Sequence, residues 1–344
     1  MAGWEMIYEY ALEPSLVVDW ALAGDGCCVS QFGLDCRRLV SDFPTDWKGL
    51  VFADFLARYD YDYGHPDVAN TQPTLDAFLQ ILTDCMVLRQ IHLPQRAAWL
   101  EEAINEHFQR PFHAIFARRR PEDSPADVIT EENIRNVRDP HWRLPTIKTT
   151  RKSAADIASR LRPLLQAASK IFLIDPYFDA SKKRFQDPFA EIMRQTAMQP
   201  RAVSSSPVIS LITGVERHFK ETAKPTNEQE IGKRRKEEAN VAAEIVRQAR
   251  CHLAALVPNG LAVKISVLKN PTRGDPLHNR FVLTDVGGVI LPYGLDERDR
   301  DGQCATDDLT LLPQGMYWER WKQYAEGKGI EVVLGPEDMQ GTGR

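Results

Sequence analysis

The chain has 344 residues, of which 43% are hydrophobic and 26% charged, a composition that is typical of folded globular proteins and excludes collagen-like, low-complexity and disulfide-scaffold classes. It lacks both a secretory signal and the run of roughly 18 apolar residues that a membrane helix needs, so we expect a cytoplasmic protein without membrane insertion. Residues 1–150 carry 14 Lys and Arg against 23 Asp and Glu, and residues 151–344 carry 29 Lys and Arg against 25 Asp and Glu. The acidic first half therefore suits a protein partner, and the second half can face a polyanion.

The first 118 residues are predicted to form an acidic, mainly helical interaction domain. Apolar residues recur at helical spacing over 75–86 and again over 97–108. Residues 119–152 contain several prolines and little apolar periodicity, which favours a linker or interdomain strap.

Residues 153–338 are predicted to form a second domain in which strands alternate with helices. Ser153-Ala-Ala-Asp156 has the form of a helix-capping box, and the apolar run 170–174 is a buried strand that delivers Asp175 to its carboxyl end. Gly287-Gly288 is predicted to form a hairpin turn. This order predicts an α/β protein whose second domain has three layers, a mixed sheet and functional residues at strand ends. The other elements expected there are strands over 208–213, 261–267, 277–285 and 289–291, and helices over 227–256 and 314–324.

The segment 277–296 carries the residues best suited to chemistry. Alternate residues of an extended strand share a face, so His278 and Arg280 are predicted to point the same way. An Arg offers a fixed fork of donors to phosphate oxygens, and a neutral His can attack phosphorus or move a proton. Asp285 falls on the opposite face of a regular strand, which favours a supporting role for its carboxylate.

The motif His278-x-Arg280-x4-Asp285, followed by Gly294-Leu-Asp296, resembles the HxKx4D…GxxN signature of the phospholipase D superfamily. It is more similar still to the phospholipase D-like domain at the C-terminus of MIT-domain proteins and to its bacterial relatives in conflict or anti-phage gene clusters. Asp175-Pro-Tyr177-Phe178 matches their upstream DPY strand, and the resemblance covers about 150–330. It implies catalytic roles for His278, Arg280 and Asp285, binding roles for Asp175, Tyr177 and Asp296 and, as a second half-site, for His218 and Lys220, and no cofactor or metal.

The sequence departs from the family pattern in three places. Active members use two histidines, each beside a Lys, and the second His-x-Lys here, His218-Phe-Lys220, lacks an Asp at the family spacing. Catalysis would therefore need a homodimer that pairs two copies of His278. Arg280 replaces a Lys, which keeps phosphate affinity, and Asp296 places a carboxylate where the family has neutral groups.

Two functions and a structural alternative follow. In the first function, which the missing second strand favours, the domain is a module of an anti-phage or conflict system that binds phosphate, nucleic acid or a partner protein. In the second, a homodimer is a metal-independent phosphodiesterase or nuclease. In the structural alternative, Arg280 pairs with Asp175 or Asp296 and locks the end of the sheet. The basic run 233–236 would contact phosphate only if it lies beside His278; otherwise it forms a solvated helix face with i,i+4 ion pairs.

Overall fold

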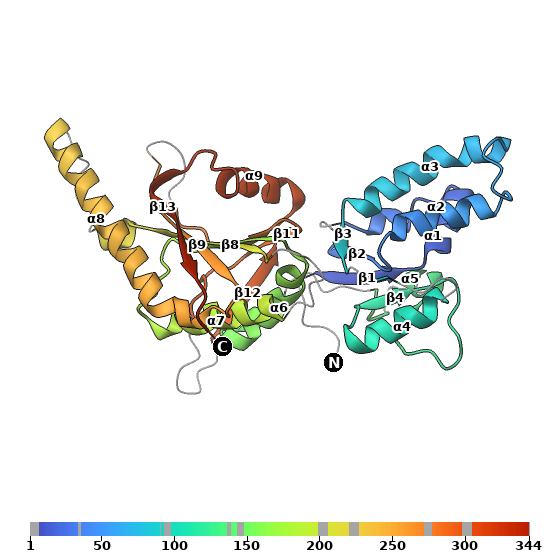
Figure 1. The fold of residues 1–344 in the computed structure, drawn as a ribbon, viewed down its shortest axis with the longest axis horizontal. Helices are drawn as coiled ribbons and strands as arrows, with labels where there is room; N and C mark the ends of the chain where they lie inside the picture. The colour runs from blue at the N-terminus through green and yellow to red at the C-terminus, as the bar shows by residue number, and fades with distance from the viewer. Residues whose placement is uncertain are drawn as a thin grey trace. The chain divides into compact units, whose positions relative to one another are not determined.

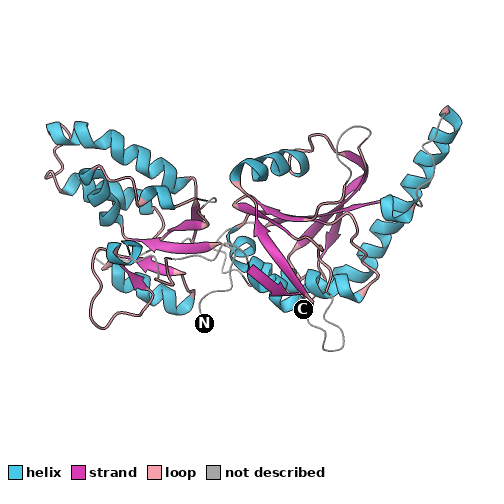
Figure 2. Ribbon diagram, turned by 180° about the vertical axis from the view of Figure 1, so that it is seen from behind, coloured by secondary structure: helices cyan, strands magenta, loops and turns pink. Residues whose placement is uncertain are grey.

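The computed structural model describes residues 7–33, 36–89, 91–92, 98–135, 139–142, 148–198, 206–219, 227–271, 277–297 and 305–343. These form two compact units, one up to residue 142 and one from residue 148 onward (Figures 1 and 2). Each unit has its own β-sheet with helices packed on it, so the α/β class predicted from the sequence is confirmed. No helix of the described chain is long and apolar enough to cross a membrane.

The first unit is built on a five-stranded parallel sheet with the order β3-β2-β1-β4-β5. Most strand residues are buried, as expected for a parallel sheet that helices cover. Helices α1, α2 and α3 lie on one face and α4 on the other (Figure 1). The elements are β1 (Tyr8–Leu12), α1 (Pro14–Ala23), β2 (Arg38–Asp42), α2 (Trp47–Ala57), α3 (Pro66–Thr83), β3 (Met86–Leu88), α4 (Trp99–Gln109), β4 (Ala114–Phe116), β5 (Val128–Ile129) and α5 (Glu131–Arg135).

The helical spacing predicted over 75–86 and 97–108 corresponds to the end of α3 and to α4, except that Met86 begins β3, and the sequence did not predict the sheet. β3 and β4 have three residues each and β5 has two, which is too short for periodicity to reveal. β5 lies inside the predicted linker 119–152 and pairs with β4, so that part of the linker prediction is wrong. The unit also includes Trp142, whose ring packs 5.8 Å from that of Tyr10.

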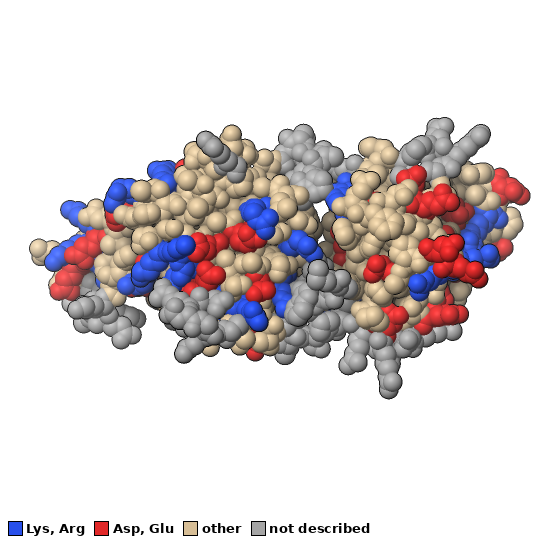
Figure 3. All heavy atoms as spheres, turned by 90° about the horizontal axis from the view of Figure 1, so that it is seen from below, with Lys and Arg blue, Asp and Glu red and all other residues tan. Residues whose placement is uncertain are grey.

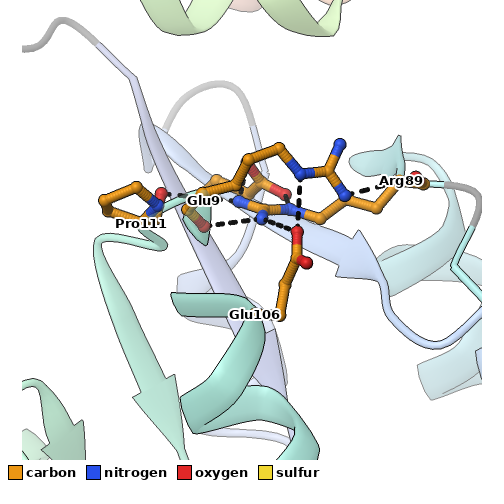
Figure 4. A network of polar contacts seen from close by, with 5 residues as sticks. Glu9, Arg89, Glu106 and Pro111 are labelled. Carbon is orange, nitrogen blue, oxygen red and sulfur yellow. Dashed lines mark hydrogen bonds and ion pairs between the residues drawn. The ribbon is translucent and has the colours of Figure 1, made fainter. Parts of the chain in front are cut away.

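A buried ion network joins this sheet to α4 (Figure 4). Arg89, which follows β3 and is 6% exposed, binds the carboxylate of Glu9 through Nε (2.7 Å) and Nη2 (3.0 Å). Its Nη1 donates to Glu106 of α4 (2.7 Å) and to the carbonyl of Arg110 (2.7 Å), and Nη2 also donates to the carbonyl of Pro111 (3.4 Å). All five guanidinium N–H groups therefore have partners within the unit, and we assign Arg89 a structural role.

The second unit contains an eight-stranded mixed sheet with the order β13-β9-β8-β7-β10-β11-β12-β6. Helices α6 and α7 lie on one face and α9 on the other (Figures 1 and 2), which gives the three layers that the sequence predicted. The elements are β6 (Lys148–Arg151), α6 (Ala154–Ala167), β7 (Lys170–Ile174), α7 (Lys183–Ala197), β8 (Val208–Gly214), α8 (Glu228–Leu253), β9 (Ala262–Lys269), β10 (Phe281–Thr284), β11 (Gly287–Ile290), β12 (Thr306–Leu311), α9 (Gln314–Tyr324) and β13 (Glu331–Gln340).

This topology brings many strand ends to one edge of the sheet. β7, β8 and β9 are parallel, so their carboxyl ends meet. β10 begins at the same edge and β11 ends there, because β10 is antiparallel to β7 and β11 is antiparallel to β10. β12 likewise begins there, and β6, its antiparallel partner, ends there. We call this edge the site edge; its residues are 152, 175–178, 215–219, 270–271, 277–280 and 291–297.

The hairpin of β10 and β11 differs from the prediction. Its turn is Asp285-Val286, because Thr284 pairs with Gly287, so the predicted turn at Gly287-Gly288 is wrong. Both glycines belong to β11. A Cβ on Gly288 would lie 2.7 Å from a side-chain atom of Leu283, so close packing rather than a turn requires glycine at this position.

Candidate functional site

Asp175, the residue after β7, lies buried at the centre of the site edge with a side chain that is 1% exposed. Its carboxylate accepts hydrogen bonds from the backbone N–H groups of Tyr177 (2.9 Å) and Leu295 (3.1 Å). Burial raises the pKa of this carboxyl, and the two N–H groups and Arg280 oppose that shift. Asp175 therefore connects the segment after β7 to the segment after β11.

Arg280 is the basic residue of the motif, to which the resemblance assigns phosphate binding. Its Nε lies 3.7 Å from the carboxylate of Asp175, and its Nη1 donates to the carbonyl of Pro292 (2.8 Å). The guanidinium carbon lies 4.7 Å from the centre of the Tyr177 ring. The ion pair of the structural alternative is thus present, and Arg280 connects three segments of the site edge.

His278 and Arg280 do not lie on a regular strand. β10 begins at Phe281, opposite Ile174, where β7 ends, so residues 278–280 have no partner strand on that side. The alternation rule that predicted a shared face does not apply to them. His278 is exposed and Arg280 is half-buried, so their environments differ.

Asp285 lies at the other end of β10 from Arg280. Its carboxylate accepts hydrogen bonds from the backbone N–H groups of Ser169 (2.9 Å) and Lys170 (3.1 Å) and from the Ser169 hydroxyl. It therefore fixes the start of β7, which agrees with the supporting role expected for a side chain on the face opposite His278 and Arg280. The length of β10 separates Asp285 from the site edge, so a direct role there has no support in its contacts.

Asp296 is buried at the site edge, and its countercharge comes from α7. Its Oδ1 lies 3.4 Å from Nε of Arg184, which the sequence did not single out. The next residue, Glu297, accepts a hydrogen bond from the N–H of Ala154 at the start of α6 (3.0 Å) and donates its own N–H to the carbonyl of Arg184 (2.8 Å). The Gly294-Leu-Asp296 motif thus connects the sheet to the helices α6 and α7.

His218 follows β8 and reaches the same edge together with Arg217. Nε of Arg217 donates to Nε2 of His218 (2.9 Å), and Nη1 of Arg217 donates to the carbonyl of Tyr177 (3.0 Å). Burial and the neighbouring Arg217 lower the pKa of His218, so the imidazole is neutral at pH 7. Tyr177 consequently contacts both Arg217 and Arg280. Lys220 lies outside the described residues.

The basic run of α8 lies beside the site edge. Arg234 stacks on Phe219 (3.6 Å) and lies 4.0 Å from Glu216, both of which follow β8. Glu216 accepts a hydrogen bond from the N–H of Asn270 (2.8 Å), and the Asn270 side chain accepts one from the N–H of Leu277 (2.7 Å). Arg234 is thus linked through Glu216 and Asn270 to the segment that begins at Leu277, and no contact of the described residues joins the basic run directly to His278.

The first turns of α8 project beyond the sheet (Figure 1). Lys233, Arg235 and Lys236 are exposed there. Glutamates accompany them, and Lys233 lies 3.9 Å from Glu237 in an i,i+4 pair. On the face drawn in Figure 3, basic and acidic side chains likewise interleave over the second unit.

Sequence reasoning missed Arg184 and Arg217. Arg217 could have been found, because it stands beside His218 directly after a predicted strand. Arg184 gives no such signal, because its partner Asp296 is more than a hundred residues away in the chain.

Comparison with known proteins gives no family for the chain. No protein-family model matches it, and no curated protein matches it. Among solved structures, the chain is similar to TrmBL2, an archaeal chromatin protein with a novel mode of DNA binding. The match covers 75% of this chain and 70% of that chain, with 9% sequence identity and a TM-score of 0.24. A TM-score this low carries no argument, so the resemblance to phospholipase D-like domains stays a prediction.

Proposed function

We propose that the second unit is a phospholipase D-like module of a bacterial anti-phage or conflict system that binds nucleic acid at its site edge without cleaving it. The observation that carries this proposal is the position of Arg280, which forms an ion pair with Asp175, donates a hydrogen bond to the carbonyl of Pro292 and lies over the ring of Tyr177. A catalytic role would require this guanidinium to hold the phosphate instead. The cations Lys233, Arg235 and Lys236 of α8 are exposed, and only Lys233 among them has an ion pair in the described residues, with the exposed Glu237, so they can neutralise phosphates. The acidic first unit retains its predicted role, the docking of a partner protein of the same system.

Charge removal on α8 tests the binding proposal. We expect the triple variant Lys233→Gln, Arg235→Gln and Lys236→Gln to bind a single-stranded oligonucleotide of about 20 nucleotides more weakly, because a site of this kind covers roughly 4–16 nucleotides. Each lost phosphate contact lowers the slope of log K against log salt by about 0.7, so the slope should fall by about 2. Fluorescence anisotropy at several salt concentrations measures both quantities.

The matched control removes the same charge elsewhere in the unit. Arg247, Lys322 and Lys328 are exposed, and their replacement by Gln leaves the α8 run intact. This control should keep wild-type affinity. Equal affinity of both triple variants would show that the α8 run does not bind the oligonucleotide.

The phosphodiesterase remains a second candidate, because segments 217–218 and 278–280, each with one His and one Arg, end at the same edge of the sheet. We expect no cleavage of the oligonucleotide by the wild-type protein in EDTA, because Arg280 is engaged by Asp175. Denaturing gel electrophoresis after long incubation checks this expectation. Cleavage that resists EDTA and disappears in His278→Ala would replace the binding proposal with the enzyme that acts through a homodimer.

A further inference from the structure

Two exposed tyrosines at the site edge each have a cation over one face of the ring. Tyr177 is 40% exposed, and the guanidinium carbon of Arg280 lies 4.7 Å from its ring centre. Tyr293 is 52% exposed, and Nζ of Lys152 lies 4.6 Å from its ring centre. We propose that these two rings form a stacking platform for the bases of single-stranded nucleic acid. The inference rests on the proposed function and names the ligand class of the same site.

The backbone around both rings is fixed. The N–H of Tyr177 is bound to Asp175, and its carbonyl is bound to Arg217. Tyr293 follows Pro292, whose carbonyl accepts the hydrogen bond from Arg280. A single guanidinium, that of Arg280, therefore contacts the ring of Tyr177 and the residue next to Tyr293, so it connects the two segments that carry the rings.

The cations hold the rings in place from the protein side. Lys152 is 2% exposed, so its ammonium approaches Tyr293 from inside the unit. Burial raises the pKa of the nearby Asp307, and the ammonium of Lys152 opposes that shift. Arg280 is held by Asp175 and Pro292. A ring attracted to a fixed cation through its inner face loses little further freedom when a base stacks on its outer face.

A single strand fits this surface better than a duplex. Every base has a π-face that an aromatic side chain can cover, and base–aromatic stacking tolerates any sequence. Paired bases keep these faces inside the helix, whereas an unpaired strand can present them. The exposed cations of α8 lie beside the same edge, and they can bind the backbone of the strand whose bases reach the tyrosines.

The experiment compares two probes of equal charge, single-stranded oligodeoxythymidine and an abasic deoxyribose-phosphate oligomer of the same length. We expect the full-length protein to bind the base-containing probe more tightly in anisotropy titrations. Tyr177→Leu and Tyr293→Leu should each weaken that binding about 5- to 100-fold, with no change for the abasic probe. Tyr177→Phe and Tyr293→Phe keep the rings and should retain wild-type affinity.

A control and a second readout keep the test decisive. Trp318 is also exposed, but its neighbour Tyr317 binds the carbonyl of Thr284 at the far end of β10, so Trp318→Leu should change nothing. If a Leu variant does not fold, Tyr293→Trp replaces it. The difference in tryptophan fluorescence between this variant and the wild-type protein should decrease when the base-containing probe binds and stay unchanged with the abasic probe.

The outcomes separate the platform from the proposed function. If both probes bind equally and the Leu variants bind like wild type while the α8 variant binds weakly, the platform is overturned and binding by charge stands. If neither probe binds, the proposed function fails, and the platform fails with it. Binding of a peptide but of neither oligomer would assign the edge to a protein partner instead.

Discussion

Arg89→Met is expected to destabilise the first unit by about 3–5 kcal/mol, because it leaves the half-buried carboxylate of Glu9 without a countercharge and takes one of two cations from the buried carboxylate of Glu106. Arg89 makes a bidentate contact with Glu9 and a third charged contact with Glu106, and it is the residue on which the network of Figure 4 converges. Glu106 keeps Arg110 at 2.6 Å, but Glu9 has no other ion pair within the described residues. Urea denaturation followed by hydrogen exchange, resolved by peptide, would assign the loss to the first unit.

The control for this variant is an arginine of the same unit on the surface. Arg58 pairs with Asp19 (2.6 Å) and Asp54 (3.0 Å), but its side chain is partly exposed, and water screens these pairs. Arg58→Met should therefore cost about 0–1 kcal/mol. A loss for Arg89→Met that is no larger than this would show that the buried network does not stabilise the unit. Addition of Glu9→Gln to Arg89→Met should restore part of the stability, since it removes the uncompensated charge.

The two units differ in how much the sequence could predict. In the second unit, β7 and β8 are apolar runs that end in Asp175-Pro and in Gly214, and their predicted positions are confirmed within about a residue. The first unit has strands of two to five residues, and tertiary pairing defines them more than local pattern does. Helical spacing was the stronger signal there, so the sheet was missed.

The site shows a similar division. Asp175 was predicted at the carboxyl end of a strand, and the structure places it there, because a parallel strand delivers its last residue to the edge of the sheet. The roles of Lys152 and Tyr293 could not be predicted, because they depend on the pairing of β6 with β12, which joins residues more than 150 positions apart. The positions of α8 and Phe219 depend in the same way on side-chain packing and not on a motif.

Gly294→Ala is expected to destabilise the second unit by about 2–5 kcal/mol. Gly294 has a φ of +75°, a backbone conformation that costs an L-residue about 1–2 kcal/mol. A Cβ there would also lie 2.2 Å from Oδ2 of Asp175 and 2.8 Å from Cδ of Arg280, so the ion pair would have to move, at the cost of about 1–3 kcal/mol that overpacking brings. Urea denaturation with peptide-resolved hydrogen exchange over β7, β10 and β11 would measure the loss.

A second glycine separates the two contributions. Gly327 has a φ of +73°, and a Cβ there meets no atom within 4 Å, so Gly327→Ala should cost only the backbone strain. The difference between the two variants measures how tightly Asp175 and Arg280 pack against the Gly294-Leu-Asp296 motif. Because Arg280 also holds the ring of Tyr177, Gly294→Ala should weaken oligonucleotide binding as well, and Gly327→Ala should not. Equal losses of stability in both variants would contradict the close contact on which the arrangement of the site edge depends.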